Sequence, residues 1–352
     1  MTAPPMARAR SMASADLPLA VGPAMRMASD RSPSLAGRAP ASQPSGSHVE
    51  DYIATLIAAP GSQALDADAV AKAKAALPHA AEGDWLAPTE ALDLVMRMDV
   101  PAAGRIDALR TLAAGVTHAL AGLPVDVIVQ PRATRRKKLL LADMDSTMIG
   151  QECIDELADF VGKKAHVSEI TERAMRGEIA FEPALRERVA LLKGLAAEIV
   201  EKVIAERITL TPGGRELVRT MRANGAHTAL VSGGFTLFTA KIAEAIGFHE
   251  NRANLLIVED GAFAGLVQEP ILGREAKLAT LLELREAHGL APEETMAIGD
   301  GANDLAMLGE AGLGVAFHAK PAVAAAAHAR IDHGDLSALL FAQGYRREQF
   351  AA

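Results

Sequence analysis

The 352-residue sequence has a single cysteine, Cys153, and few aromatic side chains: 9 Phe, 2 Tyr and 1 Trp, together 3%. One cysteine excludes an intramolecular disulfide or a zinc site built on several cysteines, and it fits a reducing compartment such as the cytoplasm. The scarcity of aromatic rings argues against stacking platforms for nucleic-acid bases. The net charge of −8 also argues against a nucleic-acid partner, because such proteins present a basic face.

Long apolar runs are absent as well. Half of the residues are hydrophobic, but no uninterrupted stretch is long enough to span a bilayer, so we expect no membrane partner. The length allows two domains or more. Residues 1–46 are rich in Ala, Ser, Pro, Met and Arg and show no sustained periodicity. This composition favours a disordered segment or a mis-assigned translation start over a transit peptide.

Residues 47–134 predict a small α/β domain. His48–Ala58 and Val125–Val129 have the composition of strands, and Asp66–Leu77 and Arg105–Ala121 have helical spacing. The basic segment Arg132–Lys138 that follows predicts an exposed linker.

The rest of the chain alternates short apolar strands with helices, over residues 135–148 and 208–345. This alternation predicts an α/β fold with a doubly wound parallel sheet. Residues 149–207 have a helical pattern almost throughout, which predicts a four-helix insert after the first strand of this part. Asp260–Gly261, between two apolar runs, predicts a hairpin turn.

Carboxylates follow two of the apolar strands. Asp143 and Asp145 come directly after the first, and Asp300 and Asp304 come shortly after a later one. Open α/β sheets carry their chemistry at the carboxyl ends of the strands. Two like charges this close repel each other unless a cation lies between them or one is protonated. Because Mg²⁺ prefers carboxylates together with water and substrate phosphate, the acid pairs predict a magnesium site.

A third strand ends in a small hydroxyl and two glycines, Ser232, Gly233 and Gly234, just before a predicted helix. Free N–H groups at a helix N-terminus bind phosphate readily. Lys277, near the start of a further amphipathic helix, is placed to offer a point charge to a phosphoryl group.

These motifs, taken in order, resemble those of the haloacid dehalogenase superfamily. Three further stretches bring the chain close to the phosphoserine phosphatases of that superfamily: Glu152–Glu156, Glu172–Gly177 and Leu185–Val189. The resemblance spans residues 136–342. It implies a Rossmann-like core with a helical cap over residues 149–207. For residues 47–134 it implies a degenerate amino-acid-binding (ACT-like) domain, and a dimerisation or packing unit stays open as an alternative.

The same resemblance implies a role for each site residue. Asp143 would be the nucleophile and Asp145 the general acid and base. Mg²⁺ would be held by the side chains of Asp143 and Asp300, by the backbone carbonyl of Asp145, and by Asp304 through water. The residues that it implies for substrate binding are Glu152 for an ammonium group, Arg188 for a carboxylate, Met175 and Phe181 as apolar walls, Ser232, Gly233 and Lys277 for phosphoryl oxygens, and Asn303.

The implied reaction is Mg²⁺-dependent hydrolysis of O-phosphoserine to serine and phosphate through an aspartyl-phosphate, the last step of serine biosynthesis. Three alternatives stay open: transfer of the phosphoryl group to another alcohol, action on a different small phosphate ester, and an amino-acid sensor in which residues 48–131 bind serine. The sequence also leaves a homodimer open.

Overall fold

The computed structural model describes residues 49–79 and 83–352. The prediction for residues 1–46 lies outside these ranges. Among the helices that are described, none combines the length and the apolar character needed to cross a membrane.

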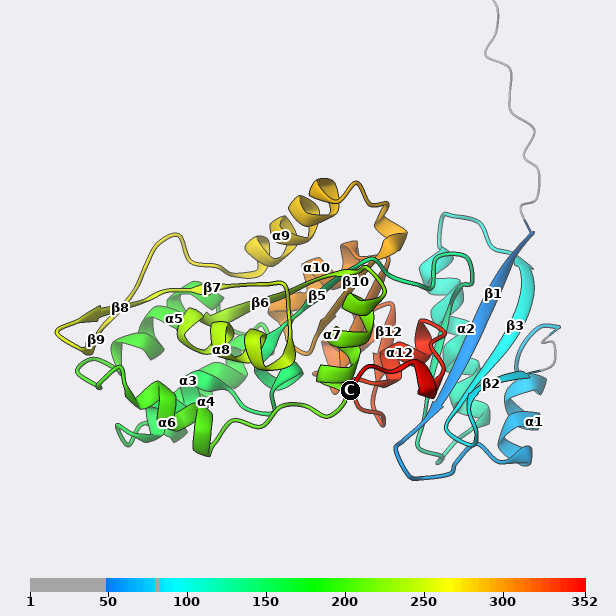
Figure 1. The fold of residues 1–352 in the computed structure, drawn as a ribbon, viewed down its shortest axis with the longest axis horizontal. Coiled ribbons are helices and arrows are strands. Elements are labelled where there is room, and N and C mark those ends of the chain that lie inside the picture. The colour runs from blue at the N-terminus through cyan, green and yellow to red at the C-terminus, as the bar shows by residue number, and fades with distance from the viewer. Residues whose placement is uncertain (1–48, 80–82) are drawn as a thin grey trace, which may run out of the picture. The chain divides into compact units, whose positions relative to one another are not determined.

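Within the described ranges, six strands form a parallel sheet (Figure 1). The run Leu139–Leu141 is fully buried, as its unbroken apolar sequence predicts for a strand covered on both faces. The order across the sheet is β12 (Ala329–Ile331), β11 (Leu313–Phe317), β10 (Thr295–Gly299), β5 (Leu139–Ala142), β6 (His227–Phe235) and β7 (Glu250–Asn254). β5 and β10 are neighbours, so the acidic segments that follow them meet at one edge.

Helices cover both faces of this sheet. Successive residues of a strand point to opposite faces; Leu140 belongs to the same hydrophobic cluster as Met221 and Phe238, while Leu141 belongs to a second cluster with Leu281 and Met307. The predicted doubly wound sheet is therefore confirmed. The helices are α7 (Gly214–Ala223), α8 (Thr236–Ile246), α9 (Arg274–Ala287), α10 (Leu305–Glu310), α11 (Pro321–Ala326) and α12 (Ala338–Ala342), with short 3₁₀ turns at Pro292–Glu294, Ala302–Asp304 and Arg347–Gln349.

The helices expected over residues 149–207 are present. They are α3 (Cys153–Asp159), α4 (Lys164–Met175), α5 (Phe181–Ala190) and α6 (Ile199–Glu206). The predicted hairpin is also present, as β8 (Leu256–Glu259) and β9 (Ala262–Val267). Phe263 in β9 exchanges backbone hydrogen bonds with Gly194 and Leu195, so the hairpin is attached to the inserted helices.

Residues 49–131 form an antiparallel sheet flanked by two helices. The elements are β1 (Val49–Ala58), α1 (Ala67–Ala75), β2 (Gly83–Ala87), β3 (Ala91–Asp99), α2 (Arg105–Ala119) and β4 (Val125–Pro131), with strand order β2-β3-β1-β4. This is the order of a split β-α-β fold. The strands β2 and β3 were not predicted from the sequence. An amino-acid-binding role for this unit stays a prediction.

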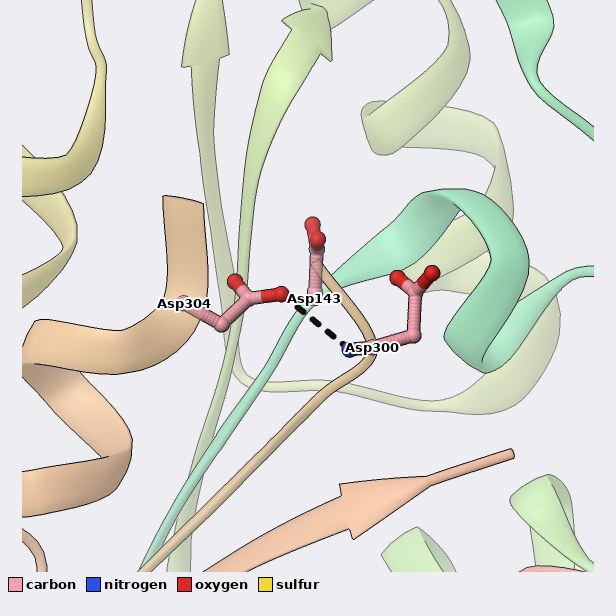
Figure 2. Close-up of side chains that lie close together, drawn as sticks. All are labelled: Asp143, Asp300 and Asp304. Carbon is pink, nitrogen blue, oxygen red and sulfur yellow. Dashed lines mark hydrogen bonds between the residues drawn. The ribbon is translucent and has the colours of Figure 1, made fainter. Parts of the chain in front are cut away.

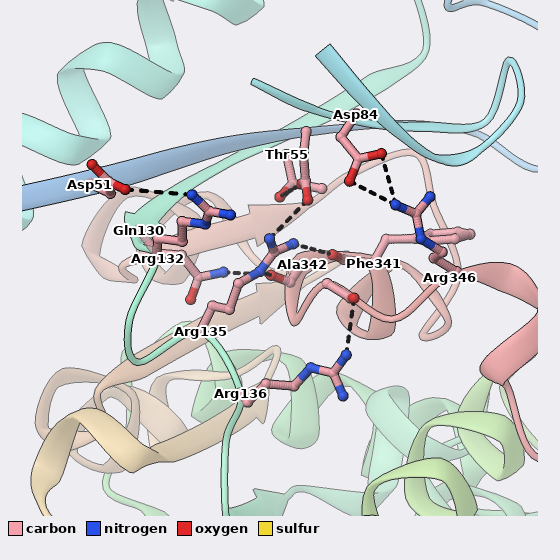
Figure 3. A network of polar contacts seen from close by, with 12 residues as sticks. Asp51, Thr55, Asp84, Gln130, Arg132, Arg135, Arg136, Phe341, Ala342 and Arg346 are labelled. Atoms are coloured by element: carbon pink, nitrogen blue, oxygen red, sulfur yellow. Dashed lines mark hydrogen bonds and ion pairs between the residues drawn. The ribbon is translucent and has the colours of Figure 1, made fainter. Parts of the chain in front are cut away.

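The prediction of an exposed linker over Arg132–Lys138 holds only in part: Arg132, Arg136 and Lys138 are exposed, but Lys137 is buried. Lys137 is only 5% exposed, and its ammonium donates to the carbonyl of Glu293 at 2.8 Å. Arg135 forms an ion pair with Asp93 of β3 at 2.8 Å. It also donates to the carbonyl oxygens of Phe341 and Ala342, each at 3.2 Å (Figure 3). The basic residues here make bonds between the antiparallel sheet and the C-terminal part of the chain.

Candidate active site

The site begins where β5 ends. The backbone N–H of Asp143 donates to the carbonyl of Ile298 in β10 at 3.0 Å, which ties the two acidic segments together. The carboxylate of Asp143 accepts the N–H of Met144 at 2.7 Å. The chain then turns at Ser146, whose φ of 53° lies in the left-handed region. Such a backbone is uncommon for a residue other than glycine and is often found at functional sites.

Three buried carboxylates converge at this edge of the sheet. One oxygen each from Asp143, Asp300 and Asp304 lies within 4.8 Å of the others (Figure 2). Asp304 also accepts the backbone N–H groups of Asp300 at 3.2 Å and of Gly301 at 3.1 Å. Gly299 makes room for it, since a Cβ at this position would stand 2.3 Å from the Cγ of Asp304.

Lys277 neutralises part of this charge. Its ammonium is fully buried, 2.8 Å from Asp143 and 2.7 Å from Asp304. Burial alone would lower the pKa of Lys277, but the charges of the two carboxylates raise it above its ordinary value. Burial and the neighbouring carboxylates also raise the pKa of Asp300, and that of Asp304 to about 7. Three carboxylates and one ammonium leave a negative excess, which suits a hard divalent cation with oxygen ligands.

Asp145 lies outside this group of three. Its carboxyl accepts the backbone N–H of Cys153 at 3.4 Å, and burial raises its pKa to about 7. Glu152, just before α3, accepts the hydroxyl of Ser146 at 2.6 Å, and burial together with the charge of Asp145 raises its pKa. A carboxyl group with a pKa near 7 can both give and take a proton at neutral pH.

A cavity of about 200 Å³ opens beside these groups. Predicted residues from separate parts of the chain line it together: Asp143, Asp145, Glu152, Met175, Phe181, Arg188, Ser232, Gly233 and Asn303. Lys277 does not line the cavity, because its ammonium is buried between the carboxylates of Asp143 and Asp304. The structure therefore brings the predicted site residues to one place.

The inserted helices approach the glycines near the end of β6 and after β10. A Cβ on Gly233 would stand 2.7 Å from the Cζ of Phe181, so only glycine lets this ring approach. A Cβ on Gly301 would stand 3.2 Å from the Cε of Met175. The hydroxyl of Ser232 accepts the N–H of Gly234 at 2.9 Å, near the end of β6, where the pairing of β6 with β7 shifts register between Val231 and Phe235.

Arg188 is buried in the cavity wall, at 4% exposure. Its guanidinium donates to the hydroxyl of Thr171 at 2.9 Å and to the carbonyl of Ala184 at 3.0 Å. Among the described residues, no carboxylate lies within ion-pair distance of it, and burial lowers its pKa. A buried cation without an anionic partner is costly, so this one is suited to an anionic group in the cavity.

Asn303 carries a buried polar atom without a hydrogen-bond partner among the described residues. This atom is its side-chain oxygen. Buried polar atoms are nearly always bonded, so a donor on a bound molecule would satisfy it.

Sequence reasoning missed other residues of the cavity wall: Ile154, Thr171, Ala174, Gly177, Ile179, Leu185, Arg274 and Ala302. Arg274 could have been found, because it stands in the segment that carries Lys277. Thr171 could not, since only the packing of α4 against α5 brings it to Arg188.

The doubly wound sheet, with buried carboxylates and a lysine at the carboxyl ends of its strands, is that of an α/β protein with an acidic candidate active site. A model of the haloacid dehalogenase-like hydrolase family matches residues 140–309. The chain is 46% identical over 224 residues to a phosphoserine phosphatase of a Polaromonas species, covering 62% of this chain and 95% of that protein. The chain therefore belongs to the haloacid dehalogenase-like hydrolases, in the branch of the phosphoserine phosphatases.

Solved structures of the same family have a similar fold. A phospho-aspartyl intermediate analogue of a phosphoserine phosphatase is 43% identical, with a TM-score of 0.56, over 58% of this chain and 98% of its own. A haloacid dehalogenase-family hydrolase of Salmonella enterica serovar Typhi is 28% identical, with a TM-score of 0.70, over 83% of this chain and 97% of its own. The matched 83% of this chain is more than residues 132–352 can supply, so the likeness to the Salmonella protein extends into the antiparallel sheet.

Proposed function

We propose that this chain hydrolyses O-phospho-L-serine to L-serine and phosphate, through an aspartyl-phosphate on Asp143. The observation that carries the proposal is the single cavity that joins Asp143 to a half-buried carboxyl, Glu152, and to a buried arginine, Arg188. Phosphoserine carries a phosphate, an ammonium group and a carboxylate, and each has a partner of fitting charge there. The names of the relatives support the same substrate.

The first step is attack by a carboxylate oxygen of Asp143 on phosphorus. The bond from phosphorus to the serine oxygen breaks, and that oxygen takes the proton held by Asp145. Lys277 holds the attacking carboxylate in place. In the second step Asp145 takes a proton from water, the water oxygen attacks phosphorus, and the bond to Asp143 breaks to release phosphate.

The three buried carboxylates of Asp143, Asp300 and Asp304 fit a divalent cation, because Lys277 offsets only part of their negative charge. The side chains of Asp143 and Asp300 and the backbone carbonyl of Asp145 would hold Mg²⁺, with Asp304 reached through water. Such an ion offsets the charge of the phosphoryl group.

We assign substrate recognition to the inserted helices, acting as a cap. Arg188 would bind the carboxylate and Glu152 the ammonium group, as charge-assisted hydrogen bonds. Met175 and Phe181 already contact the core loops from the cap side, and they would exclude water from the closed site. Ser232, Gly233 and Asn303 would bind near the phosphoryl group and serine.

A phosphate-release panel tests this proposal. Phosphoserine, phosphothreonine and a set of sugar phosphates are compared at equal concentration, with Mg²⁺ and with EDTA. We expect release from phosphoserine to exceed release from the sugar phosphates and to require Mg²⁺. A preference for sugar phosphates would contradict the assignment of Glu152 and Arg188. Product analysis with homoserine present separates hydrolysis from phosphoryl transfer. The cytoplasmic location, the homodimer and the place in serine biosynthesis stay predictions.

A further inference from the structure

A buried carboxylate on the antiparallel sheet holds a loop of the hydrolase core. Asp126 of β4 is 4% exposed. Its two oxygens accept the backbone N–H groups of Asp332 at 2.8 Å, His333 at 3.2 Å and Gly334 at 2.7 Å. A Cβ at Gly334 would stand 3.1 Å from an oxygen of Asp126, so this approach suits glycine. Asp126 therefore fixes the backbone of residues 332–334.

The segment of residues 331–334 also bonds to His318. The Nε2 of His318 lies 2.9 Å from the carbonyl of Gly334. Since a carbonyl only accepts, Nε2 carries the proton. The backbone N–H of His318 donates to Ile331 at 2.9 Å. His318 has a φ of 44°, in the left-handed region, and a residue other than glycine keeps that conformation only where its surroundings hold it. Its two bonds to residues 331–334 do so.

His318 lies two residues before a backbone contact with Asp300, one of the three clustered carboxylate residues. The backbone N–H of Lys320, two residues on, donates to the carbonyl of Asp300 at 3.1 Å. The side chain of Asp300 is held only weakly: among the described residues its one hydrogen-bond contact is the hydroxyl of Thr147, at 3.5 Å. Asp143 and Asp304 are instead held by Lys277. The position of Asp300 therefore depends mainly on its backbone.

We propose that His318 is a positioning residue that couples the antiparallel sheet to the metal affinity of the site. Asp126 sets the position of Gly334, Gly334 holds His318, and the segment after His318 sets the backbone of Asp300. The inference rests on the proposed function, in which Asp143, Asp300 and Asp304 bind a divalent cation. It gives the antiparallel sheet a part in supporting the active site.

The test measures binding of Mn²⁺ by electron paramagnetic resonance, without substrate, to the full chain and its variants. His318→Asn removes the bond to Gly334 but tolerates a left-handed backbone, and Asp126→Asn removes part of the amide cradle. Loss of one net hydrogen bond predicts a rise in the Mn²⁺ dissociation constant of about two- to tenfold for each variant. Arg346→Ala is the matched control, because it breaks the ion pair to Asp84 of β2 at 2.8 Å but leaves residues 332–334 alone (Figure 3).

The double variant of Asp126 and His318 decides whether the two residues act in one chain of contacts. Coupled residues give non-additive effects, so the double variant should bind Mn²⁺ about as well as the weaker single variant. Fold-changes that multiply, a single variant that binds like the wild type, or an equal loss in Arg346→Ala would overturn the coupling. The phosphatase assignment would survive any of these results. If the wild type binds no Mn²⁺, or Asp300→Asn keeps the binding, the metal site itself is wrong, and both proposals fall.

Discussion

Replacing Arg188 by Ala should separate recognition of the amino acid from phosphoryl chemistry. Arg188 is 4% exposed, and its guanidinium has no carboxylate partner among the described residues. A hydrogen bond to a charged group contributes about 1.5–3 kcal/mol, which corresponds to a loss of roughly ten- to a hundredfold in kcat/KM for phosphoserine. Para-nitrophenyl phosphate lacks the amino acid, so its hydrolysis should change little. The assay is phosphate release from both substrates at saturating Mg²⁺.

Arg186→Ala is the control for this prediction. Arg186 lies on the same helix, α5, but its ion pairs with Glu182 and Glu269 are exposed, and such pairs contribute little. It should leave both substrates unaffected. The Arg188 variant also deprives Thr171 and Ala184 of a donor, so its thermal unfolding is measured alongside. An equal loss with both substrates would refute the reasoning, because Arg188 would then support the fold or the closed cap. Glu152→Gln should behave like Arg188→Ala, through the ammonium group.

Three further predictions concern the nucleophile, the metal and a buried lysine. Asp143→Asn should lose turnover by several orders of magnitude while keeping its circular dichroism spectrum, because an amide is a poor nucleophile; a beryllium fluoride adduct on another residue would contradict this. EDTA should abolish phosphate release and Mg²⁺ restore it, since Asp143 and Asp300 offer oxygen ligands; full activity in chelator would exclude the metal. Burial lowers the pKa of Lys137 to about 8, so the unfolded state binds more protons than the folded state between that value and the ordinary lysine pKa of about 10.4. The free energy of unfolding should therefore rise with pH across that interval, and urea titrations of Lys137→Met should lack this rise.

The regular elements of the hydrolase core were predictable because their signals are local. An unbroken apolar run such as Leu139–Leu141 indicates a strand buried on both faces, and Asp260–Gly261 between two apolar runs indicates a hairpin turn. The strand β3 was missed, although Leu92, Leu94 and Met96 alternate with other residues along it. The exposed linker over Arg132–Lys138 was only partly right, because Lys137 is buried and Arg135 partly so. A run of basic residues is normally solvated, and nothing local shows that carbonyl groups of distant segments will bind Arg135 and Lys137.

The sequence by itself determined the chemistry of this site: which side chains follow which strands, and in what order along the chain. Parallel strands bring their carboxyl ends to one edge, so the sequence predicts that Asp143 and Asp300 lie at the same edge, but they meet because the fold makes β5 and β10 neighbours in the sheet. Only the tertiary structure decided that Asp304 and Lys277 complete the buried group, that Asp145 stays outside it, and that Thr171 holds Arg188. These outcomes depend on burial and on contacts between residues far apart in the chain. Burial and neighbouring charge also set the pKa of Asp145 and Asp304 near 7, because both properties arise only once the chain has folded.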